Sequence, residues 1–556
     1  MLSFIFLLIA GATAFNNPRG VDIWCGKAYR PTNASFNPGG WFEEPTVSSV
    51  PLLDFRIRPR MTLYLESDSV GSFLVDASVS DQIGEPLYTA SNVSSSTKEK
   101  LHYTITVGNS SVVKVNATTL ELGTSDNEVH FDPHEIPVSP TPYKVTIHGS
   151  LHGQNFTANT ELLRLPKTKG SATRLDNLYG GLSVQKPNST TWDLMFPYTY
   201  YVQWTLYWNE SVSTLDDFAA RGYNVIHIVP TGDLGSTPFP WDVFEPYLQR
   251  ADELGLYFQY DVRWEFANLT TMIDQVTRLR EHPSILLWYT GDEPDGKSNP
   301  LNSTEIAYST IRALDLYHPV SMALNCANFY YREYAAGAEI ILSDVYPVST
   351  NTSWSTVYET PCNATYGCCG CDDCTGSMAD ISTRLDSFAH FDDVIGWSKT
   401  HWSAPQAFGN ETFWSRYPTA AEEVVMALVA VNHGAKGLVM WDFPTTDELL
   451  RITDRLAKVV TDTEVVEFLL GAELVPLDSL RADLDAAAWI AADGRLLISV
   501  INLGYGDIKG AVGIKIPVGD HITKTLWGDI DWRIADGIIE TESEIPGLGV
   551  SLLMAR

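Results

Sequence analysis

Apolar and polar positions alternate with a period of two over the first third of the chain. β-Branched and aromatic runs at residues 61–66, 101–107 and 143–151 are separated by stretches rich in Ser, Asn, Gly and Pro. Successive side chains of a strand point to opposite faces, so this alternation predicts half-buried strands joined by turns. We therefore expect residues 15–180 to form an N-terminal antiparallel β-sandwich domain.

Between residues 190 and 470 the pattern changes to continuous apolar runs, most of them preceded by a stretch with helical periodicity. The apolar runs cover residues 194–201, 224–229, 256–264, 284–294, 320–325, 338–347, 403–409 and 436–444. Alternation of buried strands with helices at this length predicts an α/β fold, a (β/α)8 TIM barrel. The alternative is an open doubly wound sheet, but no G-x-G-x-x-G follows any run, so its dinucleotide-binding form has no support.

The last part of the chain, residues 471–556, returns to short strands. Residues 487–504 have the pattern of a hairpin that turns at Asp493 and Gly494, and residues 547–555 form a final apolar run. We expect a C-terminal β-sandwich domain, so that the barrel is flanked by two β-domains.

Residues 1–14, MLSFIFLLIAGATA, have the pattern of a secretory signal peptide: a short apolar core followed by a small-x-small site. Asn-x-Ser/Thr occurs at Asn33, Asn92, Asn109, Asn116, Asn155, Asn188, Asn209, Asn268, Asn302, Asn351, Asn363 and Asn410. A dozen sequons behind a signal sequence predict a secreted, extracellular glycoprotein.

Five of the seven cysteines lie between Cys362 and Cys374, and the others are Cys25 and Cys326. The spacing C-x5-CC-x-C-x2-C matches no structural zinc pattern, and in an oxidising compartment it favours a disulfide-stapled loop over a metal site. Because the total is odd, at least one thiol remains unpaired or pairs between chains. We expect Cys326, which is far from the cluster and follows a buried strand, to be a free buried thiol.

The charge balance narrows the classes of partner. With 37 Lys and Arg against 68 Asp and Glu the formal net charge is −31, which argues against a nucleic acid or an anionic lipid surface as a partner. After the leader, no apolar run approaches the roughly 20 residues that a membrane-spanning helix needs. We expect a monomer that binds neither nucleic acid nor membrane.

In a barrel of this kind, active sites lie at the carboxyl ends of the strands. The residues that end the predicted strands and carry the chemistry are Asp261, Arg263, Trp264, Asp292, Glu293, Asp344, Tyr346, Gln406, Trp441 and Asp442, with Glu411 shortly after the seventh strand. Histidine is nearly absent from these ends and no G-x-S-x-G occurs, so we expect no metal, no cofactor and no serine esterase. Paired carboxyls with aromatic walls suit sugar chemistry, in which one carboxyl protonates the glycosidic oxygen and another acts as nucleophile or base.

The segment 285–294, ILLWYTGDEP, resembles the end of the fourth strand in clan A glycoside hydrolases. Together with Gln406-Ala-Phe-Gly and residues 434–443, it is similar to secreted, fungal-type members of that superfamily. The resemblance implies that Glu293 is the general acid/base. Asp292 stands where the clan usually has Asn, and Gln406 ends the seventh strand, where the clan has its nucleophilic Glu.

The second catalytic carboxyl is therefore left open between Glu411, which lies inside the sequon of Asn410, and Asp344, with Asp442 as a further substitute. The expected substrate-binding residues are Asp292, Asp261, Arg263, Trp264, Tyr346, Gln406, Trp441 and Asp442. The sequence predicts a secreted glycoside hydrolase, expected to be retaining, that acts on a poly- or oligosaccharide. The alternatives are a carbohydrate-binding or cell-wall glycoprotein that has lost its nucleophile, and a transglycosylase with the same residues.

Overall fold

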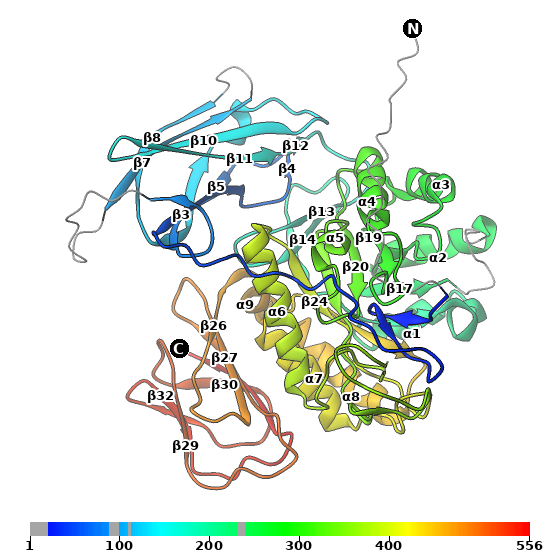
Figure 1. Cartoon of the computed structure of the whole chain (residues 1–556). Coiled ribbons are helices and arrows are strands. Elements are labelled where there is room, and N and C mark those ends of the chain that lie inside the picture. Colours follow the sequence, from blue (N-terminus) through cyan, green and yellow to red (C-terminus); the bar gives the residue numbers. More distant parts are fainter. Residues whose placement is uncertain (1–19, 88–98, 109–112, 231–239, 368) are drawn as a thin grey trace.

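The computed structural model describes residues 20–87, 99–108, 113–230, 240–367 and 369–556. Figure 1 shows three parts: a β-domain formed by the blue and cyan N-terminal segments, a green and yellow barrel, and an orange and red C-terminal β-domain. The predicted signal peptide, residues 1–14, lies outside the described residues.

Two four-stranded sheets form the N-terminal β-domain. Their orders are β6-β3-β5-β9 and β11-β10-β7-β8. The strands are β3 (Leu52–Pro59), β5 (Gly71–Ser80), β6 (Glu85–Pro86), β7 (Lys100–Val107), β8 (Val113–Glu121), β9 (Thr124–Phe131), β10 (Tyr143–Leu151) and β11 (Gln154–Leu162). Neighbouring strands in both sheets are antiparallel, and one apolar core, which includes Phe73, Ile105 and Ile147, lies between the sheets. The alternating pattern thus gives the sandwich that the sequence predicts.

Eight parallel strands close into a barrel in chain order, β16-β17-β18-β19-β20-β21-β24-β25. The strands are β16 (Tyr198–Gln203), β17 (Val225–Val229), β18 (Tyr257–Asp261), β19 (Ile285–Asp292), β20 (Val320–Leu324), β21 (Ile340–Ser343), β24 (Thr400–Ser403) and β25 (Leu438–Phe443). The helices around it are α1 (Thr214–Ala220), α2 (Trp241–Leu254), α3 (Leu269–Leu279), α4 (Ser303–Leu314), α5 (Tyr331–Ala335), α6 (Ala379–Ile395), α7 (Ala420–Asn432) and α8 (Asp447–Val460). The prediction of a TIM barrel is confirmed, and the continuous apolar runs reflect strands buried on both faces.

A small antiparallel sheet connects the sandwich to the barrel, where the sequence pattern indicates only a connector. It consists of β13 (Ala172–Leu175), β14 (Leu182–Gln185) and β15 (Asp193–Leu194). Leu175, Leu182 and Val184 pack with Val225 and Leu286 of the barrel strands in one cluster. This sheet therefore closes one end of the barrel and leaves the site at the opposite, carboxyl end.

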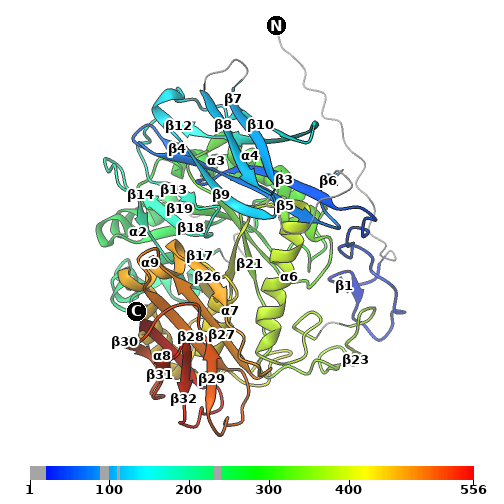
Figure 2. The same cartoon turned by 90° about the vertical axis from the view of Figure 1, so that its left-hand side faces the viewer.

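Residues after α9 (Thr463–Gly471) form the C-terminal β-domain, with a sheet of order β26-β27-β28-β33-β30 facing a sheet of order β29-β32-β31. The strands are β26 (Glu473–Pro476), β27 (Leu484–Ile490), β28 (Leu496–Asn502), β29 (Val512–Lys515), β30 (Ile522–Trp527), β31 (Arg533–Ala535), β32 (Ile538–Thr541) and β33 (Val550–Ala555). β27 and β28 form the predicted hairpin, in which Gly494 adopts a left-handed φ of 85°. Figure 2 shows this domain beside α7 and α8 of the barrel.

The N-terminal arm, which we define as residues 23–29, contains β1 (Ile23–Trp24) and β2 (Lys27–Ala28). It lies against the barrel, and Cys25 forms a disulfide with Cys326, 301 residues away. The expectation that Cys326 is free is therefore wrong. The separation along the chain hides the pair, because only the return of the arm to the end of β20 brings their Cα atoms to 5.5 Å.

The cysteine-rich loop between β21 and α6 contains two further disulfides, Cys362–Cys369 and Cys371–Cys374, in agreement with the stapled loop that the spacing favours. Cys368 lies outside the described residues. Lys27 of the arm is buried and forms ion pairs with Asp372 at 2.6 Å and Asp373 at 2.8 Å. The arm and the loop thus form one connected unit beside the barrel.

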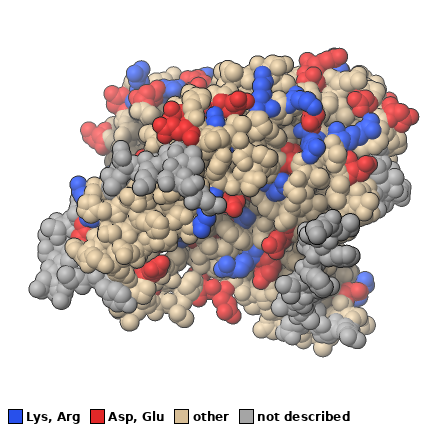
Figure 3. Space-filling view, turned by 90° about the horizontal axis from the view of Figure 1, so that it is seen from above, with Lys and Arg blue, Asp and Glu red and all other residues tan. Residues whose placement is uncertain are grey.

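On the face seen in Figure 3, acidic and basic side chains are interspersed among the described residues rather than gathered by sign. Among the helices that the structure describes, none has both the length and the apolar composition needed to cross a membrane.

Candidate functional site

Glu293 and Asp344 meet at the carboxyl end of the barrel. Glu293 follows β19 and Asp344 follows β21, and their carboxyl groups share a hydrogen bond. Burial, followed by the negative charge of Asp292, raises the pKa of Glu293. Burial and the charge of Glu293 raise the pKa of Asp344 well above its usual value. Two carboxyls in contact cannot both ionise readily, so the pair holds a shared proton more strongly than a lone carboxyl would and offers one acid and one carboxylate.

The backbone of Glu293 has a φ of 51°, in the left-handed region that a residue with a Cβ rarely adopts. Its amide donates to the carbonyl of Ala323 at 3.1 Å, and its carbonyl accepts from the amide of Lys297 at 3.0 Å. These two bonds fix the turn that follows β19. A strained conformation of this kind costs on the order of 1 kcal/mol or more and is common at functional sites.

Asp292, the preceding residue, is held as a carboxylate. It pairs with Arg263 at 2.9 Å and Lys297 at 3.0 Å, and the hydroxyl of Tyr289 donates to it at 2.8 Å. Burial alone would raise the pKa of Asp292, but the two cations outweigh it and hold the pKa well below its usual range. Its fixed charge in turn raises the pKa of Glu293.

Arg263 and Asp261 are buried beneath Asp292 rather than exposed at the surface of the site. The Arg263 Nε donates to Asp261 at 2.7 Å, and the same carboxylate accepts from His227 at 2.8 Å. Both residues are buried. The guanidinium also faces the rings of Tyr201, Tyr289 and Trp441, with centroids 5.4 to 5.7 Å away. Asp261 and Arg263, expected to bind substrate, are therefore placed to position Asp292.

A cavity of about 290 Å³ adjoins Glu293. Besides Glu293, Asn325 and Gly370, its lining consists of six aromatic residues: Trp24, Tyr29, Tyr346, Tyr358, Phe413 and Trp414. They come from the N-terminal arm, the end of β21, the cysteine-rich loop and the loop before α7. We refer to this space as the aromatic cavity.

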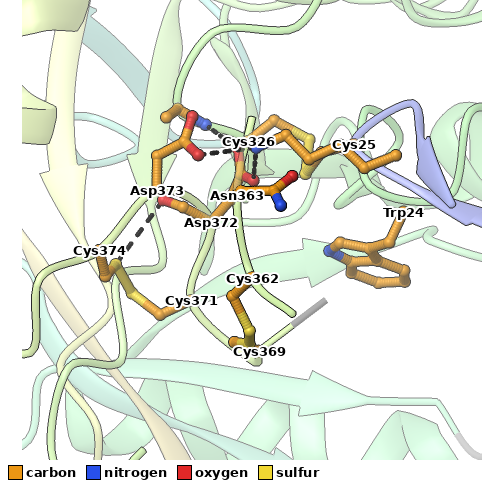
Figure 4. A network of polar contacts seen from close by, with 12 residues as sticks. Trp24, Cys25, Cys326, Cys362, Asn363, Cys369, Cys371, Asp372, Asp373 and Cys374 are labelled. Carbon is orange, nitrogen blue, oxygen red and sulfur yellow. Dashed lines mark hydrogen bonds and ion pairs between the residues drawn. A yellow bond between two sulfur atoms is a disulfide. The ribbon is translucent and has the colours of Figure 1, made fainter. Parts of the chain in front are cut away.

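Asn325 joins the aromatic cavity to the carboxyl pair. Its side-chain amide donates to Asp344 at 3.4 Å, and its oxygen accepts from the indole of Trp24 at 2.7 Å. Figure 4 shows Trp24 next to the Cys25–Cys326 disulfide, with Asp372 and the cysteine-rich loop beyond it. Asn325 is thus in position to fix both the wall of the cavity and one member of the pair.

Gln406 and Glu411 do not join the carboxyl pair. Because β24 ends at Ser403, Gln406 lies beyond the strand, and its buried amide bonds the backbone of Val348, with oxygen to nitrogen at 3.0 Å. Glu411 is exposed on a turn in which its backbone pairs with Trp414. Burial, followed by the charge of Glu411, raises the pKa of Asp442 to about 6. The charges that act most on the pKa of Glu293 are those of Asp292, Lys297 and Arg263. Glu411 therefore acts on Asp442 rather than on the carboxyl pair.

The remaining candidates take different positions. Tyr346 is buried and lines the aromatic cavity, whereas Trp264 is 44% exposed and its indole donates to the carbonyl of Pro230 at 2.9 Å. Trp441 is half-buried and packs on Tyr201 with ring centroids 5.1 Å apart. Of the aromatic residues expected at the strand ends, only Tyr346 lines the aromatic cavity.

Several residues of the site carry no signal at the strand ends. Trp24 and Tyr29 lie some 300 residues before Asn325, and Tyr358, Phe413 and Trp414 lie in loops. The density of aromatics around the cysteine cluster was the available clue. Lys297 could have been noticed as a cation four residues after Glu293.

One group of side chains among the described residues has the spacing of metal ligands: Cys25, Cys326 and Asp372. The two sulfurs are joined in a disulfide, so neither offers the thiolate that a metal would require. These residues do not fit a metal in their oxidised form.

No protein-family model matches the chain, and no curated protein matches it. Among solved structures, a putative alpha-galactosidase from Bacteroides fragilis is 11% identical with a TM-score of 0.42, covering 93% of this chain and 99% of that one. A second structure, a glycoside hydrolase, is 12% identical with a TM-score of 0.45, covering 69% and 96%. A Parabacteroides merdae beta-glucuronidase is 11% identical with a TM-score of 0.30, covering 90% and 74%. Similarities this weak carry no inference about activity, and the fold rests on the closed barrel itself.

Proposed function

We propose that this chain is a glycoside hydrolase that cleaves O-glycosidic bonds of a poly- or oligosaccharide, with Glu293 as general acid/base. The observation that carries the proposal is the Glu293–Asp344 pair at the carboxyl end of the barrel, which holds one proton beside a cavity. A carboxyl whose pKa is raised above its usual value holds its proton more strongly and can deliver it to a glycosidic oxygen as general acid.

Asp344 is the second carboxyl of the proposed mechanism, in preference to Glu411. A retaining enzyme places its two carboxyls about 5–5.5 Å apart and an inverting one about 6.5–9.5 Å. The hydrogen-bonded pair is closer than either separation. The retaining route therefore requires the entering sugar to replace that hydrogen bond and separate the two groups. The anomer of the first product, observed by proton NMR, tests this route.

A second function is favoured by the same contact. If the carboxyls stay together, neither a nucleophile nor a water fits between them, and the chain binds carbohydrate without cleaving it. Gln406 supports this alternative, because its side chain is an amide that accepts a hydrogen bond from the backbone of Val348. It therefore supplies no nucleophilic carboxylate after β24. The two functions share the site and differ in whether product forms.

The test is hydrolysis of a panel of polysaccharides and aryl glycosides by the full chain. We expect Glu293→Gln and Asp344→Asn each to lower kcat/KM at least about a hundredfold, the effect typical of removing acid/base catalysis. Glu411→Gln, which changes an exposed glutamate outside the pair, serves as the matched control and keeps the wild-type rate. Loss of activity in the control alone would make Glu411 the nucleophile. A wild type that binds one glycan but cleaves none would establish the binding function.

Secretion and N-glycosylation also belong to the proposal. They rest on the apolar leader, the sequons and the three disulfides, which persist in oxidising compartments.

A further inference from the structure

The walls of the aromatic cavity form a continuous series of ring contacts. Tyr29 packs on Tyr358 at a centroid distance of 4.5 Å, Tyr358 on Phe413 at 5.9 Å, and Phe413 on Trp414 at 5.5 Å. Trp414 then packs on Tyr346 at 6.0 Å. Rings that support one another in this way form a preformed surface, so little order has to be gained when a ligand binds.

The polar atoms of this lining are largely committed to the protein. The Trp24 indole donates to Asn325, and the Trp414 indole donates to the carbonyl of Tyr346 at 3.0 Å. Both ends of the Asn325 amide are used, by Trp24 and by Asp344. Glu293 is likewise bonded to Asp344, which leaves the hydroxyls of Tyr346 and Tyr358 as the side-chain groups of the described lining best placed to meet a ligand.

This shortage of polar groups decides what kind of molecule fits. A pyranose brings several hydroxyls, and each hydroxyl that is buried without a partner costs free energy. A flat aromatic group brings none of this cost and gains stacking against the rings. An apolar cavity of about 150 Å³ holds a benzene ring, so 290 Å³ has room for a bicyclic aromatic.

We propose that the aromatic cavity binds a flat aryl group, the aglycone of an aryl glycoside. In this arrangement the sugar lies on the side of the carboxyl pair, and the aryl ring leaves as a phenol. The bond between the anomeric carbon and the phenolic oxygen breaks, and the oxygen takes the proton of Glu293. Water then supplies the hydroxyl of the released sugar, and its remaining proton returns to the carboxyl pair. The identification of the aryl group as a leaving group rests on the proposed glycosidase function, whereas its binding does not.

The arm is essential to this site, because Trp24 and Tyr29 supply one wall. Trp24 is held by its bond to Asn325 and by the adjacent Cys25–Cys326 disulfide (Figure 4). Trp354 offers a comparison, since it is an indole on the cysteine-rich loop that is 45% exposed and does not line the cavity.

The test titrates 4-methylumbelliferone against the full chain by calorimetry, without any glycosidic bond to cleave. We expect one saturable site with a Kd of about 1 mM or tighter, weakened at least about tenfold in Trp24→Ala and unchanged in Trp354→Ala. Trp24→Phe keeps an aromatic face and should recover most of the affinity. Circular dichroism and thermal unfolding of each variant show whether it has folded, and Phe413→Leu provides a second change in the wall.

Absence of binding by the folded wild type would overturn the proposal. So would binding by Trp24→Ala and Phe413→Leu that is as tight as binding by the wild type. Displacement of 4-methylumbelliferone by cellobiose would do the same, because the cavity would then be a sugar site. Failure of the glycosidase function appears separately, as a wild type that binds 4-methylumbelliferone in this cavity but hydrolyses no member of the panel.

Discussion

Glu423 lies in the first turn of α7 with both carboxyl oxygens buried and, among the described residues, without a hydrogen-bond partner. Burial raises its pKa to about 8. Between the unfolded pKa near 4.5 and this value the folded state binds more protons than the unfolded state, so stability falls as pH rises through the window. At pH 7 the loss amounts to about 3 kcal/mol.

We therefore expect Glu423→Gln to remove this dependence on pH. The melting temperature of the variant minus that of the wild type should rise steadily from pH 5 to pH 8 and then level off. Thermal unfolding over this range measures the difference, and Glu305→Gln, an exposed glutamate of α4, is the control. A difference that does not change with pH would show that the Glu423 carboxyl keeps an ordinary pKa in the folded chain.

At the residue scale, strand ends predicted part of the site. Glu293 follows β19, and Asp344 and Tyr346 follow β21, so the sequence could place all three at the carboxyl end of the barrel, although β20 lies between the two strands. It could not predict that the two carboxyls touch, because contact depends on side-chain direction. The sequence also could not predict that Arg263 is buried between Asp261 and Asp292. A cation at a strand end can face either a substrate or the carboxylates beside it, and the sequence pattern is the same in both cases.

At the element scale, a single histidine connects three elements. His433, at the end of α7, bonds Asp386 of α6 and Asp485 of β27, each at 2.7 Å. Burial alone would lower its pKa, but the two carboxylates outweigh burial and raise the pKa to about 9. A raised pKa contributes stability that is fully present below pH 6.5 and is lost as pH rises through about 9.

We expect His433→Gln to lower the melting temperature clearly at pH 6 and much less at pH 10, because the wild type loses the imidazolium as pH rises. Thermal unfolding of both proteins at the two pH values provides the comparison. His521→Gln, which changes an exposed histidine of the C-terminal domain, should show no such difference. An equal loss at pH 6 and pH 10 would mean that His433 acts through packing rather than through its charge.

The elements themselves were more predictable than their ends. Eight apolar runs became eight barrel strands because a parallel strand buried on both faces needs such a run. The seventh was displaced: residues 403–409 carry the apolar pattern, yet β24 is Thr400–Ser403. The buried amide of Gln406 is satisfied by the backbone after β21 rather than by a neighbouring strand, and hydropathy alone does not reveal such a bond.

At the scale of the whole molecule, the two β-domains and the barrel were visible in changes of periodicity, but the assembly of the aromatic cavity was not. Its walls combine the arm, the cysteine-rich loop and the ends of barrel strands. The disulfide that closes the arm on the barrel spans 301 residues. Contacts at such separations leave no periodic signal, so the sequence gives no hint that residues before the sandwich complete a site after it.

Most of the sequons in the described residues have an exposed asparagine. Those whose asparagine is exposed are Asn155, Asn188, Asn209, Asn268, Asn302, Asn351, Asn363 and Asn410, whereas Asn33 is half-buried. Asn92 and Asn109 lie outside the described residues, as does the side chain of Asn116. These accessible sequons lie on the sandwich, the connecting sheet and the barrel, and the C-terminal β-domain has no sequon. They predict glycans over the sandwich and the barrel.

We expect the chain made in a eukaryotic secretory host to lose mass on enzymatic removal of N-glycans, since each glycan is a bulky addition to an exposed asparagine. Peptide mass spectrometry after deglycosylation identifies each used site by its conversion to aspartate. Asn410, next to Glu411, is the informative position: a glycan there is compatible with Glu293 and Asp344 as the active pair and would crowd a catalytic Glu411. Asn410→Gln should therefore leave hydrolysis unchanged. Secretion without any mass shift would contradict the predicted glycosylation.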